Sequence, residues 1–104
     1  MSREATTFYE HIVQVGFAGG PVPPEDKPAL KALMETLVEL LQDTIGSIDF
    51  WQSPDKQKRL RGDIKSAIGK TTLTALKAQR ERVAVEVMKL AKNRHDELLR
   101  AGRH

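Results

Sequence analysis

The stretch "PALKALMETLVELLQDTI", residues 28–45, decides the fold class. Its apolar residues recur every three or four positions, at Leu30, Leu33, Leu37, Leu41 and Ile45. This spacing is the period of an amphipathic helix. Acidic side chains recur at intervals of four in the same stretch, which is typical of a polar helix edge: Glu35, Glu39 and Asp43. The segment is therefore predicted to form a helix with one buried face.

The segments on both sides show helical spacing, and none shows strand-like alternation. Apolar residues predict a helix over residues 3–17, ended by the Pro- and Gly-rich connector at 19–28. Ser53 before Pro54 is a helix-start signal, so a third helix is predicted to run to about Ile68, with Gly69 as a left-handed stop.

A last helix is predicted over about 73–100, which would be roughly 42 Å long at 1.5 Å per residue. The sequence thus predicts an all-α fold. It is a compact bundle of about four helices with a long C-terminal helix, in a single domain over residues 1–104.

Composition excludes several protein classes. With 39% hydrophobic and 30% charged residues, the chain is typical of a globular domain rather than a disordered one. It has no cysteine, which excludes disulfides and thiolate metal sites. Apolar runs are too short to cross a bilayer, and "MSREATTFYEH" lacks the apolar region of a signal peptide. No membrane association is expected, and the expected compartment is the cytoplasm.

Charge is divided between the two halves of the chain. Residues 1–52 hold three basic and eight acidic residues, a net charge of −5, whereas residues 53–104 hold fourteen and six, a net charge of +8. Two interpretations stay open: the acidic half folds against the basic half, or the basic half faces an anionic partner.

The tripeptide Gly69-Lys70-Thr71 matches the end of a nucleotide-binding P-loop. The full motif needs a glycine five residues before Gly69, and Ile64 stands there instead. A P-loop also follows a buried strand, whereas a charged helix is predicted here. No nucleotide site is therefore expected.

Other chemistry is equally sparse. His11, His95 and His104 share no helix face, which favours solvated surface histidines over metal ligands. No nucleophile lies near a base in a recognisable order. The chain is expected to have no catalytic residues, no cofactor, no metal and no small-molecule substrate.

Lys58, Arg61 and Lys65 are spaced three and four apart and have no acidic partner among them. They are predicted to form one basic stripe on the side of the helix away from Leu60 and Ile64. Such a stripe suits contact with DNA phosphates, and a solvated helix face is the other interpretation.

Arg80 and Arg94 fall on the apolar stripe of the predicted last helix. Either their stems cover the core while their guanidinium groups reach water, or they pair with Glu35, Glu39 or Asp43 or with a partner.

Phe50 and Trp51 stand just before the cap at Ser53. They are predicted to form an aromatic corner that plugs the core. A binding anchor is the alternative.

Three stretches in order carry a resemblance to a known family: "FYEHIVQVGFAGGPVPPEDKPALKAL", "IDFWQSPDKQKRLRGDI" and "RERVAVEVMKLAKNRHDEL". Together they resemble the carboxy-terminal helical region of the R subunit of type I restriction enzymes. The junction "SAIGKTTLTAL" departs from the family, which more often has a longer aliphatic run with an Ile-Pro there.

The resemblance implies a non-catalytic docking module that joins the DNA-translocating and DNA-cleaving subunit to the methyltransferase core. It also implies contact with DNA that emerges from the motor. The nuclease and ATPase motifs of that subunit are absent from these residues. The alternative function is a stand-alone basic helical protein that binds duplex DNA without sequence preference.

Overall fold

Every regular element is a helix in the computed structural model, which describes residues 3–17 and 20–101. The all-α bundle predicted from the sequence is confirmed. In chain order the α-helices and short 3-10 helices (η) are α1 (Arg3–Gly16), η1 (Pro24–Asp26), α2 (Lys27–Thr44), η2 (Phe50–Gln52), α3 (Pro54–Gly69), α4 (Thr74–Ala78), α5 (Arg80–Asn93) and α6 (His95–Ala101).

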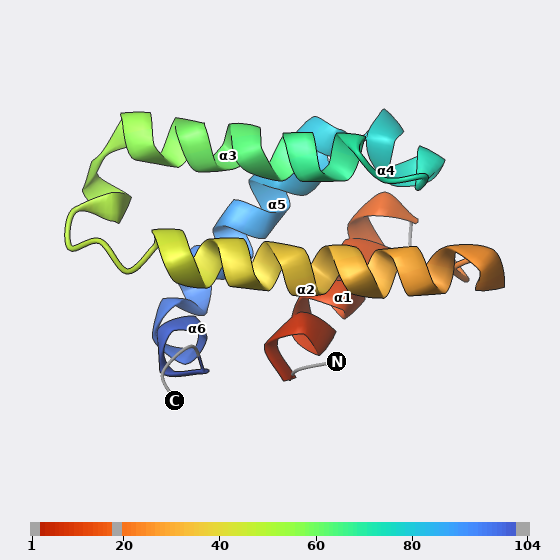
Figure 1. Cartoon of the computed structure of the whole chain (residues 1–104), viewed down its shortest axis with the longest axis horizontal. Helices are drawn as coiled ribbons and strands as arrows, with labels where there is room; N and C mark the ends of the chain where they lie inside the picture. Colours follow the sequence, from red (N-terminus) through yellow and green to blue (C-terminus); the bar gives the residue numbers. More distant parts are fainter. Residues whose placement is uncertain (1–2, 18–19, 102–104) are drawn as a thin grey trace.

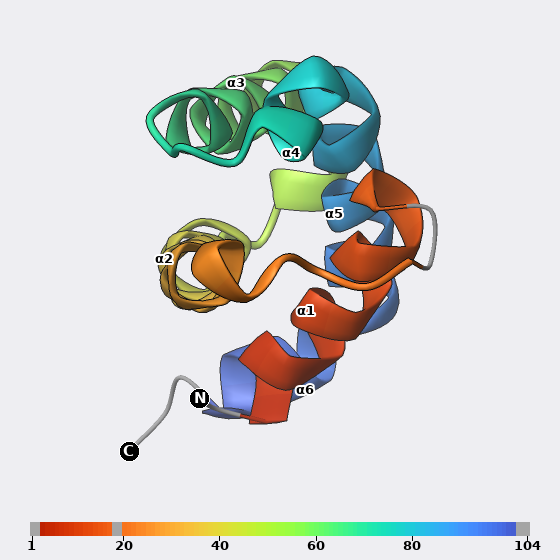
Figure 2. The ribbon, with the colours of Figure 1, turned by 90° about the vertical axis from the view of Figure 1, so that its right-hand side faces the viewer.

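The helices form two layers. Helices α2 and α3 lie side by side and run in opposite directions (Figure 1). Figure 2 looks along these two helices and shows α1 and α5 as a second layer to their right. Helix α1 packs against α2 and α5, α3 packs against α2 and α5, and α6 closes one end against α1 and α2.

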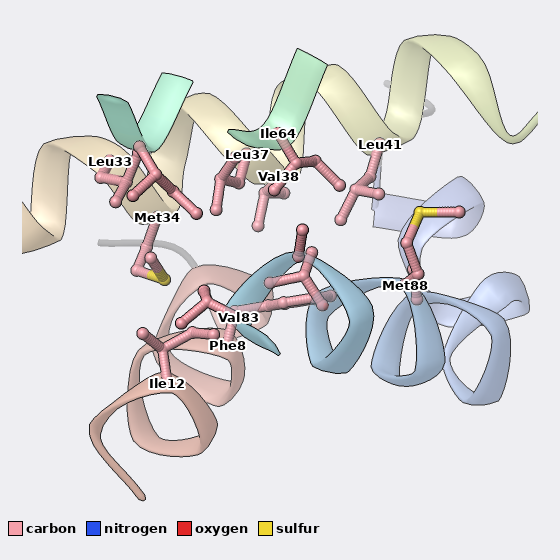
Figure 3. Close-up of a cluster of buried hydrophobic side chains, with 14 of the residues drawn as sticks. Phe8, Ile12, Leu33, Met34, Leu37, Val38, Leu41, Ile64, Val83 and Met88 are labelled. Carbon is pink, nitrogen blue, oxygen red and sulfur yellow. The ribbon is translucent and has the colours of Figure 1, made fainter. Parts of the chain in front are cut away.

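The core lies between the two layers (Figure 3). Leu37 and Leu41 of α2 meet Phe8 of α1, Ile64 of α3 and Val83 of α5 in one buried cluster. Each of these side chains is buried because it recurs on one face of its helix at the helical period. Full burial of such a side chain contributes about 1.5–3 kcal/mol, so the cluster is the main source of stability.

The connector before α2 is shorter than the predicted range of 19–28. Helix α2 begins at Lys27, so Pro28 lies in its first turn, where the missing amide hydrogen is not needed. The buried side chain of Val22 holds the connector against the core. The predicted first residue of the connector, Gly19, lies outside the described residues.

The connection from α2 to α3 is fixed by local hydrogen bonds. The backbone amide of Lys56 donates to Ser53 Oγ at 3.3 Å, which confirms the predicted cap. Lys56 Nζ also donates to Asp49 Oδ1 at 2.6 Å, and this hydrogen bond holds the pKa of the Asp49 carboxyl below its ordinary value. The start of α3 is therefore set by the residues that immediately surround it.

The left-handed stop predicted at Gly69 is wrong. Gly69 is the last residue of α3, its backbone is not left-handed, and the helix closes through Lys70 in a right-handed conformation. The Thr71 hydroxyl ends the helix in place of a left-handed glycine. It donates to the Ile68 carbonyl at 2.7 Å and accepts from the Leu73 amide at 3.2 Å. Gly69-Lys70-Thr71 thus forms the end of a helix and does not follow a strand as a P-loop does.

The single long helix predicted over 73–100 is also wrong. The structure divides this segment into α4, α5 and α6, with interruptions at Gln79 (φ −121°, ψ 24°) and Arg94 (φ −113°, ψ 24°). Figure 1 shows α4, α5 and α6 as successive segments with different directions.

Tertiary contacts explain both interruptions. At the first, Gln79 Nε2 donates to the carbonyl of Gly16 at 3.2 Å, which satisfies an open carbonyl at the end of α1. At the second, the bend returns Leu98 to the core, where it is fully buried, and Gln42 Nε2 donates to its carbonyl at 3.2 Å. Core packing therefore overrides the helical period of the sequence.

Candidate functional site

An open groove of about 570 Å³ lies between α2 and α3. Its walls are mostly small or apolar, and the groove stays unfilled because alanine and serine occupy the positions that face it. The lining side chains that matter most are Ala32, Leu33, Thr36 and Leu40 from α2 and Ser66 and Ala67 from α3.

Acidic residues border this first groove. Asp63 lines it directly. Glu39 is three residues from Thr36, and Asp43 is three residues from Leu40, so both are surface neighbours of the lining on α2. Both are exposed. The α2–α3 groove is therefore an apolar strip whose α2 border is acidic, whereas on the α3 side Asp63 is accompanied by Lys70 in the lining and by the exposed Arg59 one turn earlier.

A second groove of about 500 Å³ lies on the other flank of α3, beside the start of α5. Three basic residues line it: Lys65, Lys70 and Arg80. Gly62 and Gly69 open its floor, because nothing lies within 4 Å of the place where a side-chain Cβ would stand at either residue. Ser66 and Lys70 line both grooves, so α3 separates the two surfaces.

The predicted basic stripe is only partly present. Lys58 is exposed and Arg61 is half-buried. Lys65 has the acidic partner that the sequence did not reveal, since its Nζ lies 3.5 Å from Glu81 Oε1 at the start of α5. This pair joins residues sixteen positions apart, which no local spacing rule detects. The stripe therefore ends in an ion pair.

Arg80 and Arg94 do not cover the core as the continuous helix implied. Each arginine stands at an interruption, Arg80 as the first residue of α5 and Arg94 just after its last, and both are exposed. Within the described residues no ion pair joins either of them to Glu39 or Asp43. A charged residue at an apolar-stripe position was the sequence signal that could have located both bends.

The two residues of the predicted aromatic corner pack together but differ in burial. Phe50 is fully buried, whereas Trp51 is half-buried and packs edge-on against it, with ring centroids 4.7 Å apart. Trp51 Nε1 donates to His95 Nδ1 at 3.0 Å. The corner therefore joins the α2–α3 connection to the start of α6, and its outer edge reaches the surface.

Two of the histidines that were expected to be solvated surface residues are partly exposed but each has a side-chain partner. His95 accepts the Trp51 hydrogen bond, and His11 Nε2 lies 3.4 Å from Glu86 Oε2 across α1 and α5. Both residues are half-buried because the helices that carry them pack together. His104 lies outside the described residues. Among the described residues, no group of three or more metal-ligating side chains gathers.

Comparison with known proteins gives no neighbour: no protein-family model, curated protein or solved structure matches the chain. In the described part of the chain, no helix has both the length and the apolar character needed to cross a membrane.

Proposed function

We propose that this chain is a non-catalytic docking module of the R subunit of a type I restriction enzyme, and that it joins that subunit to the methyltransferase core. The proposal starts from the three stretches that resemble the family. In the fold these stretches cover most of α1 and the start of α2, then η2 and most of α3, then α5 and the start of α6. They meet around one core, as parts of a single module do.

The observation that carries the proposal is the α2–α3 groove. Two antiparallel helices with small facing side chains leave a channel that an apolar helix edge of a partner fills. The acidic border formed by Glu39, Asp43 and Asp63 favours a partner whose apolar strip is flanked by lysine or arginine. The expected contact on the methyltransferase core is therefore a basic amphipathic helix.

The test is a titration of the purified chain against the methyltransferase core of a type I system from the same genome. Ala32 is exposed and lines the groove, so Ala32→Arg adds bulk and positive charge there without disturbing the core. This change should weaken binding at least about tenfold, which corresponds to about 1.4 kcal/mol.

The matched control is Ala78→Arg, the same substitution at an exposed alanine that does not line the α2–α3 groove. It should change the affinity by no more than about twofold. Equal loss in both variants would refute the groove as the docking site. Failure of the unmodified chain to bind the core would refute the docking role itself.

A stand-alone DNA-binding role is the second candidate, and the basic groove beside α5 is the observation that favours it. Lys65, Lys70 and Arg80 come together there from two helices and a turn. Phosphate contacts of this kind act through charge and counterion release, so they give binding without sequence preference.

A further inference from the structure

We infer that the junction of α3, α4 and α5 binds the sugar-phosphate backbone of duplex DNA, and that the contact lies there rather than on the stripe of Lys58 and Arg61. The inference rests on the DNA-binding candidate above and is independent of the docking role. The basic groove beside α5 adjoins a third groove at the junction of α4 and α5, and the two share Arg80 and Glu81.

The two grooves together form a continuous basic surface, here called the junction surface. The charged residues that line the groove at the α4–α5 junction are Lys77, Arg80, Glu81 and Arg82. With the basic groove beside α5 included, the cations outnumber the carboxylate at this surface by a wide margin: Lys65, Lys70, Lys77, Arg80 and Arg82 surround Glu81 alone. Only Lys65 is paired with that carboxylate, so four cations face solvent without an ion-pair partner among the described residues.

The interruption at Gln79 creates this surface. In one straight helix, residues 77–82 would continue along a single rod. In the structure Gln79 turns to bind the Gly16 carbonyl, so α5 leaves at a different angle and Arg80 lies beside the end of α3. Lys70 in the turn after α3, Lys77 of α4 and Arg80 of α5 therefore line adjoining grooves.

The residues that line the junction surface favour duplex DNA over two other anionic partners, single-stranded nucleic acid and a bilayer. The junction surface has no aromatic side chain on which an unpaired base could stack. Binding to a bilayer would use an apolar anchor, but the large apolar residues that are exposed in the described chain, Ile48 and Val85, line neither groove. Gly62 and Gly69 leave α3 bare along the same side, so an elongated ligand can approach the helix closely.

The experiment measures binding of the full chain to a random 20-base-pair duplex by fluorescence anisotropy between about 0.05 and 0.3 M salt. Four phosphate contacts predict a slope of log K against log salt of about −3.6, from about 0.9 per contact. Lys77→Gln with Arg80→Gln should reduce the slope to about −1.8 and weaken binding about tenfold or more at 0.1 M salt.

Two double variants remove the same charge elsewhere. Lys58→Gln with Arg61→Gln changes the predicted stripe, and Lys27→Gln with Lys31→Gln changes α2. Both should lower the affinity by no more than about threefold and leave the slope near its original value. Glu81→Gln removes the carboxylate from the junction surface and should strengthen binding by about twofold or more.

Three outcomes would overturn the inference. The first is equal weakening by all three double variants, because the effect would then follow net charge rather than position. The second is a larger loss from the stripe variant than from the junction variant. The third is complete displacement of the duplex by inorganic phosphate at about 10 mM, or tighter binding to anionic vesicles than to the duplex, since either identifies another ligand.

Discussion

Gly16 is the residue on which the packing of α1 against α4 depends. It is buried at the end of α1, and a Cβ at this position would collide with the Leu76 side chain. The same close approach brings the Gly16 carbonyl to Gln79 and so places the first interruption of the C-terminal segment. The absence of a side chain at Gly16 therefore influences the direction of α5.

Gly16→Ala should destabilise the fold by about 1–3 kcal/mol, because Leu76 must move within a packed core. Urea denaturation measures the change. Gly62→Ala is the control, since Gly62 is exposed within α3 and nothing lies near its Cβ position. That variant should gain about 0.5–1 kcal/mol from helix propensity. Equal effects at the two glycines would show that α4 does not pack on α1 in this way.

The hydrogen bond from Trp51 to His95 is a second feature that belongs to single residues. Trp51→Phe keeps an aromatic ring but removes the indole N–H, and His95→Ala removes the acceptor. A double-mutant cycle should give a coupling of about 0.5–1.5 kcal/mol, the usual net contribution of one hydrogen bond. A coupling near zero would mean that the corner and α6 are not joined in solution.

At the scale of elements, local signals and core contacts explain different parts of the fold. The helical periods at 28–45 and the cap at Ser53 placed α2 and the start of α3, because both depend on residues close in sequence. The division of 73–100 into three helices depends on Gly16 and Gln42, which are distant in sequence. Spacing rules contain no information about such partners.

The bend at Arg94 gives a test at this scale. Leu98→Ala should cost about 2–5 kcal/mol, because the bend returns Leu98 to the core. Leu90 follows Val83 and Val87 at helical spacing but, unlike them, is only half-buried in the structure. Leu90→Ala should therefore cost distinctly less in the same urea experiment. A loss at Leu98 no larger than the loss at Leu90 would contradict the bend.

The candidate site was predicted only in part for the same reason. The stripe at Lys58, Arg61 and Lys65 follows from helical spacing alone. The junction surface needs the turn at Gln79, and the ion pair of Lys65 needs Glu81 from another helix. The alanine- and serine-lined groove between α2 and α3 has no sequence signal of its own, since small residues are common on helices that simply face solvent.

At the scale of the whole molecule, α3 lies between two surfaces of opposite character. One flank meets α2 at an apolar groove with an acidic border, and the other meets α5 at the junction surface. The two flanks are not fully separate, because Ser66 and Lys70 line both grooves. Within the described residues, Lys56–Asp49 joins the two halves of the chain across the α2–α3 connection, and His11–Glu86 adds a contact between α1 and α5.

The central claim is that protein docking and DNA contact use the two different flanks of α3. Amide NMR spectra of the labelled chain, recorded with the methyltransferase core and separately with duplex DNA, test it most directly. The core should attenuate signals of Ala32, Thr36 and Ala67, and the duplex should shift those of Gly62, Gly69 and Arg80. Perturbation of the same residues by both ligands, or of neither set by its own ligand, would contradict the claim.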